Sequence, residues 1–157
     1  MIRIDKFLPV KVGDPAPQFA EKTIDGKELR LSDYGGRFVL LDFWATWCAP
    51  CMAELPNLKT AYEKYAAEGR LVIIGVSLDS DVKDVRNFVR ERSVSWAQLA
   101  LGPAETNAVA KAYHVSSVPA TFLIGPDGKI AASDLNGQAL QDELARLLSS
   151  TPRVSRE

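Results

Sequence analysis

FVLLDFWATWCAPC, residues 38–51, holds a long apolar run and both cysteines of the chain. Residues 38–44 are apolar except for Asp42, a pattern typical of a β-strand that is buried on both faces. The segment WCAPC, residues 47–51, follows where we expect this strand to end and a helix over residues 49–68 to begin. The two cysteines therefore fall at the junction of a buried strand and a helix.

Strand and helix patterns alternate on both sides of this stretch. An Asp-Gly turn inside residues 23–29 predicts a hairpin. We expect further strands at residues 71–76, 95–101 (a short edge strand), 120–124 and 129–133, and further helices opening at Ser80 and Asp81, over residues 105–113, and through Leu140 to Leu148. Strands that alternate with helices predict an α/β sandwich built from βαβ units, with an antiparallel hairpin at its end.

Length and composition limit the classes of protein. The chain has 157 residues, which predicts one domain over residues 1–157, with a core at about 12–149, an arm at 1–11 and a tail at 150–157. It is 46% hydrophobic and 25% charged, which excludes a disordered, collagen-like or coiled-coil chain. The net charge of −1 gives no indication of nucleic-acid binding.

The cysteine pair indicates chemistry rather than a structural cross-link. The chain has only Cys48 and Cys51, and a loop that short gains little stability from a disulfide. A helix N-terminus carries unpaired N–H groups and a partial positive charge, so it stabilises a thiolate. We expect Cys48 to be the exposed nucleophile with a lowered pKa, and Cys51, on the same helix face, to resolve the mixed disulfide.

A zinc half-site is the alternative interpretation of the pair. Structural zinc needs four ligands, and beyond the two cysteines the chain offers one histidine, His114. His114 follows the helix expected at residues 105–113, where a cation suits the helix dipole, so we expect it outside the catalytic face. The sequence predicts no metal site.

No stretch has the length and apolar character of a membrane-spanning helix, and residues 1–8 lack the apolar core of a signal peptide. Two interpretations stay open: a cytosolic protein, or one whose upstream signal, anchor or domain is absent from this chain.

Four groups of residues together resemble the bacterial TlpA/ResA-type thiol-disulfide oxidoreductases of the thioredoxin-like superfamily. They lie, in family order, at 13–19 (GDPAPQF), 31–34 (LSDY), 43–51 (FWATWCAPC) with Glu54 and Pro56, and 118–124 (VPATFLI) with Asp127-Gly128. The resemblance covers about residues 12–149. It implies a three-layer sandwich with a central mixed sheet flanked by helices, an N-terminal hairpin extension and a central insertion.

The resemblance also assigns two acidic residues near the cysteines. Asp42 matches the buried acid of thioredoxins, which implies a carboxyl group of raised pKa that exchanges a proton with Cys51. Glu54, one turn beyond Cys51, is either a further acid or polar anchor near the site or an ordinary solvated helix residue.

Five residues are expected to contact the substrate. Pro119 matches the proline that the superfamily holds in the cis form opposite the cysteines. The backbone of Val118 would pair with an extended substrate as an added strand. Trp47, Ala49 and Pro50 surround the cysteines in sequence and complete the expected docking surface.

The resulting hypothesis is a disulfide reductase that works through a Cys48/Cys51 dithiol-disulfide cycle. Ala49 and Pro50 carry no charge to stabilise the thiolate further, so we expect a reducing pair, nearer the thioredoxin potential of about −270 mV than the oxidant end at about −120 mV. A disulfide oxidant or isomerase is the main alternative.

Three other functions on the same fold are less well supported. In peroxidases of this fold a Thr lies three positions before the reactive cysteine, whereas this chain has Ala45 there and Thr46 one position later. Sco-type copper chaperones use a C-x-x-x-C pair and a distant His, which C-x-x-C and His114 do not match. If the protein were a non-catalytic adaptor, Cys48→Ala would cause no measurable change.

The expected partners follow from the cycle and from the resemblance. The cycle needs a disulfide-containing protein substrate and a thiol electron donor, but no bound metal or organic cofactor. Resemblance favours a membrane-borne donor, an extracytoplasmic location (periplasmic or membrane-anchored) and cytochrome c maturation as one pathway. Residues 80–112 would carry partner choice, and we expect a monomer that does not bind nucleic acid.

Overall fold

The protein is built on a mixed sheet of five strands in the order β5-β4-β3-β6-β7. A computed structural model describes residues 10–149; the expectations for residues 1–9 of the arm and for the tail at 150–157 lie outside this range. The strands are β3 (Phe38–Trp44), β4 (Leu71–Ser77), β5 (Ala97–Ala100), β6 (Ala120–Ile124) and β7 (Ile130–Ser133). β4 runs parallel to β3 and β5, whereas β6 runs antiparallel to β3 and β7.

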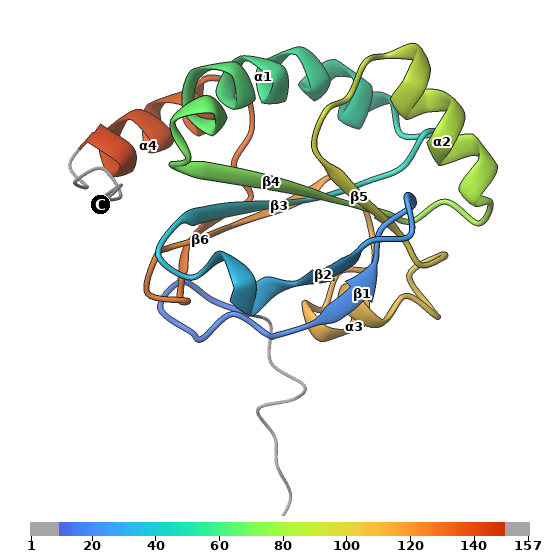
Figure 1. Ribbon diagram of the computed structural model, residues 1–157, viewed down its shortest axis with the longest axis horizontal. Helices are drawn as coiled ribbons and strands as arrows, with labels where there is room; N and C mark the ends of the chain where they lie inside the picture. Colours follow the sequence, from blue (N-terminus) through green and yellow to red (C-terminus); the bar gives the residue numbers. More distant parts are fainter. Residues whose placement is uncertain (1–9, 150–157) are drawn as a thin grey trace, which may run out of the picture.

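Helices cover one face of this sheet and a hairpin with a short helix covers the other (Figure 1). The first face carries α1 (Ala49–Tyr65), α2 (Val82–Glu91) and α4 (Gly137–Ser149), and the second carries α3 (Ala108–Ala112) with β1 (Ala20–Lys22) and β2 (Glu28–Arg30). This is the thioredoxin-like α/β arrangement with an N-terminal hairpin that the sequence predicts.

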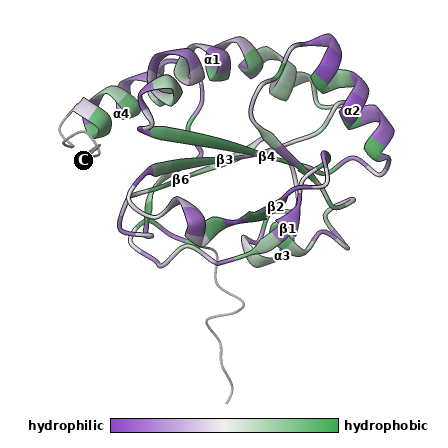
Figure 2. Cartoon of the chain, viewed as in Figure 1, coloured by the Kyte–Doolittle hydropathy of each residue, from purple (hydrophilic) through white to green (hydrophobic). Residues whose placement is uncertain are grey.

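Successive side chains of β3 point to opposite faces of the sheet, and each face has its own hydrophobic core. Val39, Leu41 and Phe43 pack on the side of α3. Phe38 and Leu40 pack on the opposite side, against apolar residues of α1 and α4. Figure 2 shows the apolar strands enclosed between these layers. Asp42 lies on the same face of β3 as Phe38 and Leu40, so it faces the layer that contains α1.

The predicted strands at 38–44, 71–76 and 120–124 agree with the structure, and the differences lie at short elements. The predicted helix at 105–113 is wrong in its first turn: α3 spans only Ala108–Ala112. Asn107 begins it, because its side-chain oxygen accepts the backbone N–H of Ala110 at 3.0 Å. Gly26 turns the hairpin with a φ of 81°.

The predicted edge strand and the end of the long helix are also close to the observed elements. β5 is indeed an edge strand, shorter than residues 95–101. After α1 a 3₁₀ turn (Ala66–Glu68) ends at Gly69 in the left-handed conformation. None of the helices within residues 10–149 has both the length and the apolar character needed to cross a membrane.

Candidate active site

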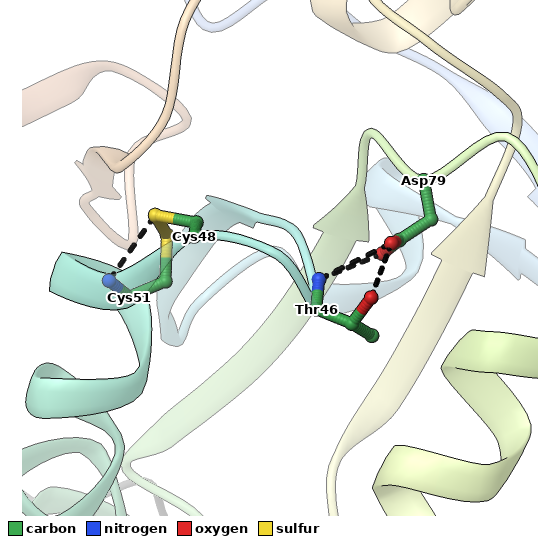
Figure 3. Close-up of a disulfide and its surroundings, with 4 residues drawn as sticks. All are labelled: Thr46, Cys48, Cys51 and Asp79. Carbon is green, nitrogen blue, oxygen red and sulfur yellow. Dashed lines mark hydrogen bonds between the residues drawn. A yellow bond between two sulfur atoms is a disulfide. The ribbon is translucent and has the colours of Figure 1, made fainter.

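The two cysteines form a disulfide at the N-terminus of α1 (Figure 3). Cys48 is the N-cap residue, with extended backbone angles, and Cys51 lies in the first turn. The Sγ atom of Cys48 accepts the backbone N–H of Cys51 at 3.2 Å. A donor at this position, together with the helix dipole, favours a negative charge on Cys48 when the disulfide is reduced.

The expectation of an exposed Cys48 is wrong for this disulfide form. Cys48 is 4% exposed and Cys51 6% exposed. Trp44 and Val85 are buried in the same cluster, and the half-buried Val118 packs against it. These side chains come from β3, α2 and the loop before β6, so the cover over the sulfurs depends on segments far apart in the sequence.

Exposed residues surround the buried sulfurs. Trp47 is 68% exposed, the largest exposed fraction among the big apolar side chains within residues 10–149. Ala49 and Pro50 are also exposed, as is Pro119. The Val118-Pro119 peptide bond is cis, as the resemblance implies. Four of the five residues expected to contact the substrate are therefore exposed, and the fifth, Val118, is half-buried against the cluster that holds the disulfide.

Asp42 is buried beside the cysteine pair. It is 8% exposed and shares a hollow of about 20 Å³ with Cys51 and apolar residues that include Trp44 and Leu55. A hollow of this size is large enough for one water molecule. Burial, with a smaller contribution from the charge of Glu54, raises the pKa of Asp42 from 3.8 to about 7. Asp42 can therefore both accept and donate a proton near neutral pH.

Glu54 joins α1 to α4. It is half-buried, and its carboxylate accepts the backbone N–H of Gly137 at 2.8 Å and the side-chain N–H of Asn57 at 2.6 Å. Gly137 is the first residue of α4, so the negative charge of Glu54 also suits that helix dipole. Of the two interpretations left open for Glu54, these contacts match the polar anchor rather than the solvated residue.

A second buried carboxylate, Asp79, lies beside the turn between β3 and α1 (Figure 3). It is 4% exposed and accepts the backbone N–H of Thr46 at 3.0 Å and the Thr46 hydroxyl at 2.6 Å. The Ser77 hydroxyl donates to it at 2.6 Å. Sequence reasoning missed this group, although the ends of two neighbouring parallel strands meet at the same edge of a sheet.

A glycine in β4 makes room for a polar contact that fixes Trp44. The indole N–H of Trp44 donates to the side-chain oxygen of Gln98 at 2.8 Å. A Cβ atom on Gly75 would come within 2.1 Å of that oxygen. Gly75 is therefore required for Gln98 to reach Trp44, the residue that covers one side of the disulfide.

Comparison with known proteins identifies the family. Residues 12–133 match the AhpC/TSA family. The chain belongs to this family. Among curated relatives it is 33% identical to the thiol-disulfide oxidoreductase ResA of Bacillus thuringiensis subsp. konkukian, over 88% of this chain and 78% of that protein. It is 35% identical to ResA of Bacillus subtilis, over 77% of this chain and 65% of that protein.

Solved structures of related proteins have the same architecture as this chain. The thioredoxin domain of a thiol-disulfide oxidoreductase from Bacteroides vulgatus superposes with a TM-score of 0.80 at 29% identity, covering 88% of this chain and 99% of that one. A thiol-disulfide oxidoreductase from Bacteroides fragilis gives a TM-score of 0.78 at 31% identity, covering 85% and 99%. With its Cys48–Cys51 pair, the chain is a thiol-disulfide oxidoreductase within the AhpC/TSA family.

Two features bear on the peroxidase alternative. The Thr46 hydroxyl donates to Asp79, and Figure 3 shows it turned away from the disulfide. Ala45, at the position where peroxidases of this fold carry a threonine, is fully buried. The described residues contain no cluster of three or more histidine, cysteine or acidic side chains arranged to hold a metal ion.

His114 lies just past α3 in the left-handed conformation, with φ of 57°, and its backbone N–H donates to the carbonyl of Lys111 at 3.2 Å. This is the helix-end position that the sequence predicts. The side chain is exposed and lines a surface hollow that also touches Pro119, so His114 lies nearer to the expected docking surface than the sequence indicates.

Proposed function

We propose that this oxidoreductase reduces disulfides in protein substrates. The observation that carries the proposal is a cysteine pair at a helix N-terminus, with Cys48 as the N-cap, next to the exposed residues Trp47 and Pro50 and to Val118, which precedes the exposed Pro119. In the reduced protein the Cys48 thiolate attacks a substrate disulfide. One sulfur–sulfur bond forms to Cys48, the substrate bond breaks, and the departing substrate sulfur takes a proton.

Resolution of the mixed disulfide involves Cys51 and Asp42. The Cys51 thiol gives its proton to Asp42, and its sulfur then attacks Cys48 Sγ. The second substrate sulfur leaves as a thiolate and takes up a proton. The substrate gains two electrons and two protons in total, and the protein returns to the disulfide. The shared hollow and the raised pKa of Asp42 support this role.

Substrate binding is proposed to use backbone pairing rather than deep pockets. An extended substrate segment would pair with the backbone of Val118 as an added strand, while Trp47, Ala49 and Pro50 contact its side chains. Pairing through the main chain tolerates varied side chains, as a reductase with several protein substrates requires. Residues 80–112 are proposed to select the partner.

Electron supply and location are part of the same proposal. A thiol reductant must return two electrons to the pair, and family resemblance favours a membrane-borne donor and an extracytoplasmic location. We also propose that residues 12–149 act as one domain, since the core on each face is completed by strands of the same sheet. The pair itself carries the electrons, so the cycle uses no further cofactor.

Replacing Cys51 with serine tests the function directly. The variant retains the nucleophile but not the resolving thiol, so we expect a mixed disulfide between Cys48 and a disulfide-containing protein that persists for hours. The adduct is detected as a mass increase that dithiothreitol reverses. Cys48→Ser is the matched control and should form no adduct. Absence of the adduct with Cys51→Ser, or its appearance with Cys48→Ser, would contradict the proposal.

A further inference from the structure

Asp79 lies where the active-site turn meets the neighbouring strand. β3 and β4 are parallel neighbours, so their carboxyl ends reach the same edge of the sheet. The backbone N–H of Leu78 donates to the carbonyl of Trp44 at 2.8 Å, which joins the two chain segments just beyond the strands. From this edge one segment continues to Cys48 and the other to Asp79.

The contacts of Asp79 are directed mainly at one residue of that turn. Thr46 donates both its backbone N–H and its hydroxyl to the carboxylate. Ser77 donates its hydroxyl to Asp79 Oδ2 and accepts the Asp79 backbone N–H at 2.9 Å. The side chain of Asn107, fully buried, donates to the Ser77 carbonyl at 3.2 Å. Ser77, itself bound by Asn107, thus fixes the carboxylate of Asp79, and the carboxylate in turn binds Thr46.

The conformation of Cys48 depends on the turn that Asp79 holds. Cys48 has extended N-cap angles, φ −96° and ψ 105°, and in this conformation its Sγ accepts the backbone N–H of Cys51. Only Trp47, whose side chain is 68% exposed, separates Thr46 from Cys48. Thr46, two residues before the nucleophile, thus carries the hydrogen bonds between this turn and Asp79.

We propose that Asp79 is a positioning residue for Cys48: by binding Thr46 through two hydrogen bonds, it keeps the turn between β3 and α1 in the conformation that lets Cys48 Sγ accept the Cys51 N–H. Asp79 does not touch the sulfurs and takes no part in electron transfer. The inference rests on the proposed function only in taking Cys48 as the nucleophile. It assigns to the segment just after β4 a role in the reactivity of a cysteine on another element.

The chemistry of the donors explains why a carboxylate is suited to this place. A carboxylate only accepts hydrogen bonds, and here three donors from Thr46 and Ser77 converge on it. An amide in the same position offers one oxygen, and its NH₂ group would face a donor. Asp79→Asn should therefore loosen the turn although it removes little volume.

Thr46 variants test the inference in the full chain. In a Cys51→Ala background only Cys48 reacts with iodoacetamide, and the pH dependence of the reaction rate gives the pKa of its thiol. Thr46→Val loses the hydroxyl donor but not the shape, and we expect alkylation at pH 7 to slow about tenfold because the thiol pKa rises. Thr46→Ser keeps the donor and should react within about twofold of the parent.

Two further variants separate positioning from other effects. Thr60→Val removes a hydroxyl from an exposed part of α1, where the Thr60 hydroxyl donates to the carbonyl of Pro56, and should leave the rate unchanged. Asp79→Asn should slow alkylation as Thr46→Val does. Faster alkylation of Asp79→Asn would indicate that Asp79 acts by repelling the thiolate, and it would overturn the inference.

An unchanged rate in a folded Thr46→Val variant, or equal slowing in Thr46→Ser, would overturn the inference while the proposed function stands. If Asp79→Asn does not fold, the pair of Thr46 variants carries the test. Failure of the proposed function is recognised separately, because the protein with both cysteines would then not reduce a disulfide substrate.

Discussion

Cys48→Ser is expected to lower the rate of protein disulfide reduction at least about 10³-fold, the largest effect that the structure predicts. A serine hydroxyl is not ionised near neutral pH and does not attack a disulfide. The chain has no third cysteine, so no other thiol can take its place next to Cys51. The measurement is the reduction of a disulfide-containing protein with dithiothreitol as the electron donor.

Comparison with Cys51→Ser identifies the source of this loss. Both variants lack the disulfide, so a change in folding caused by its removal would appear in both. Only Cys51→Ser keeps the nucleophile. When it is reduced and then freed of dithiothreitol, it should consume one equivalent of substrate in a single burst before it stops. A Cys48→Ser protein that retains more than a few per cent of the rate would place the attacking group elsewhere.

Asp42→Asn is expected to change how stability depends on pH. In the folded protein Asp42 keeps its proton up to a pKa of about 7, whereas its ordinary value is 3.8. Between these pH values the folded state holds a proton that the unfolded state releases. The free energy of unfolding therefore falls as pH rises from about 4 to 8, by up to about 4 kcal/mol from this group.

Urea unfolding of the oxidised protein and of oxidised Asp42→Asn at pH 4, 5.5, 7 and 8 measures the effect. The cysteines do not titrate as a disulfide. The variant should gain stability relative to the parent as pH rises, and a difference that is constant from pH 4 to 8 would refute the assignment. Because the charge of Glu54 adds to the shift, Glu54→Gln should move the midpoint of the dependence to lower pH.

The regular parts of this fold follow from local patterns in the sequence. The apolar runs of β3, β4 and β6 are long enough to indicate buried strands, and the WCAPC segment marks the start of α1. The helix predicted at 105–113 is too long because its start depends on Asn107. The side chain of Asn107 accepts the backbone N–H of Ala110 in the folded chain, and the composition of residues 105–113 does not indicate that the helix begins at this residue.

The cover over the cysteines could not be predicted in the same way. Periodicity places Cys48 at a helix start, where side chains are usually accessible, but Val85 and Val118 approach it from remote segments. Asp79 was missed for a related reason: its partner Thr46 is 33 residues away in sequence. The parallel pairing of β3 and β4 was the one available signal, since it brings the two strand ends together.

The equilibrium reduction potential of the Cys48–Cys51 pair tests the central claim most directly. It is measured against defined thiol/disulfide buffers, with Cys48→Ala as the control that cannot form the disulfide. We predict a value below about −230 mV, as a reductase supplied by a dedicated donor requires, because no charged side chain separates the cysteines and stabilises the thiolate further. A value between about −120 and −180 mV would contradict the account and assign the protein to disulfide oxidation or isomerisation.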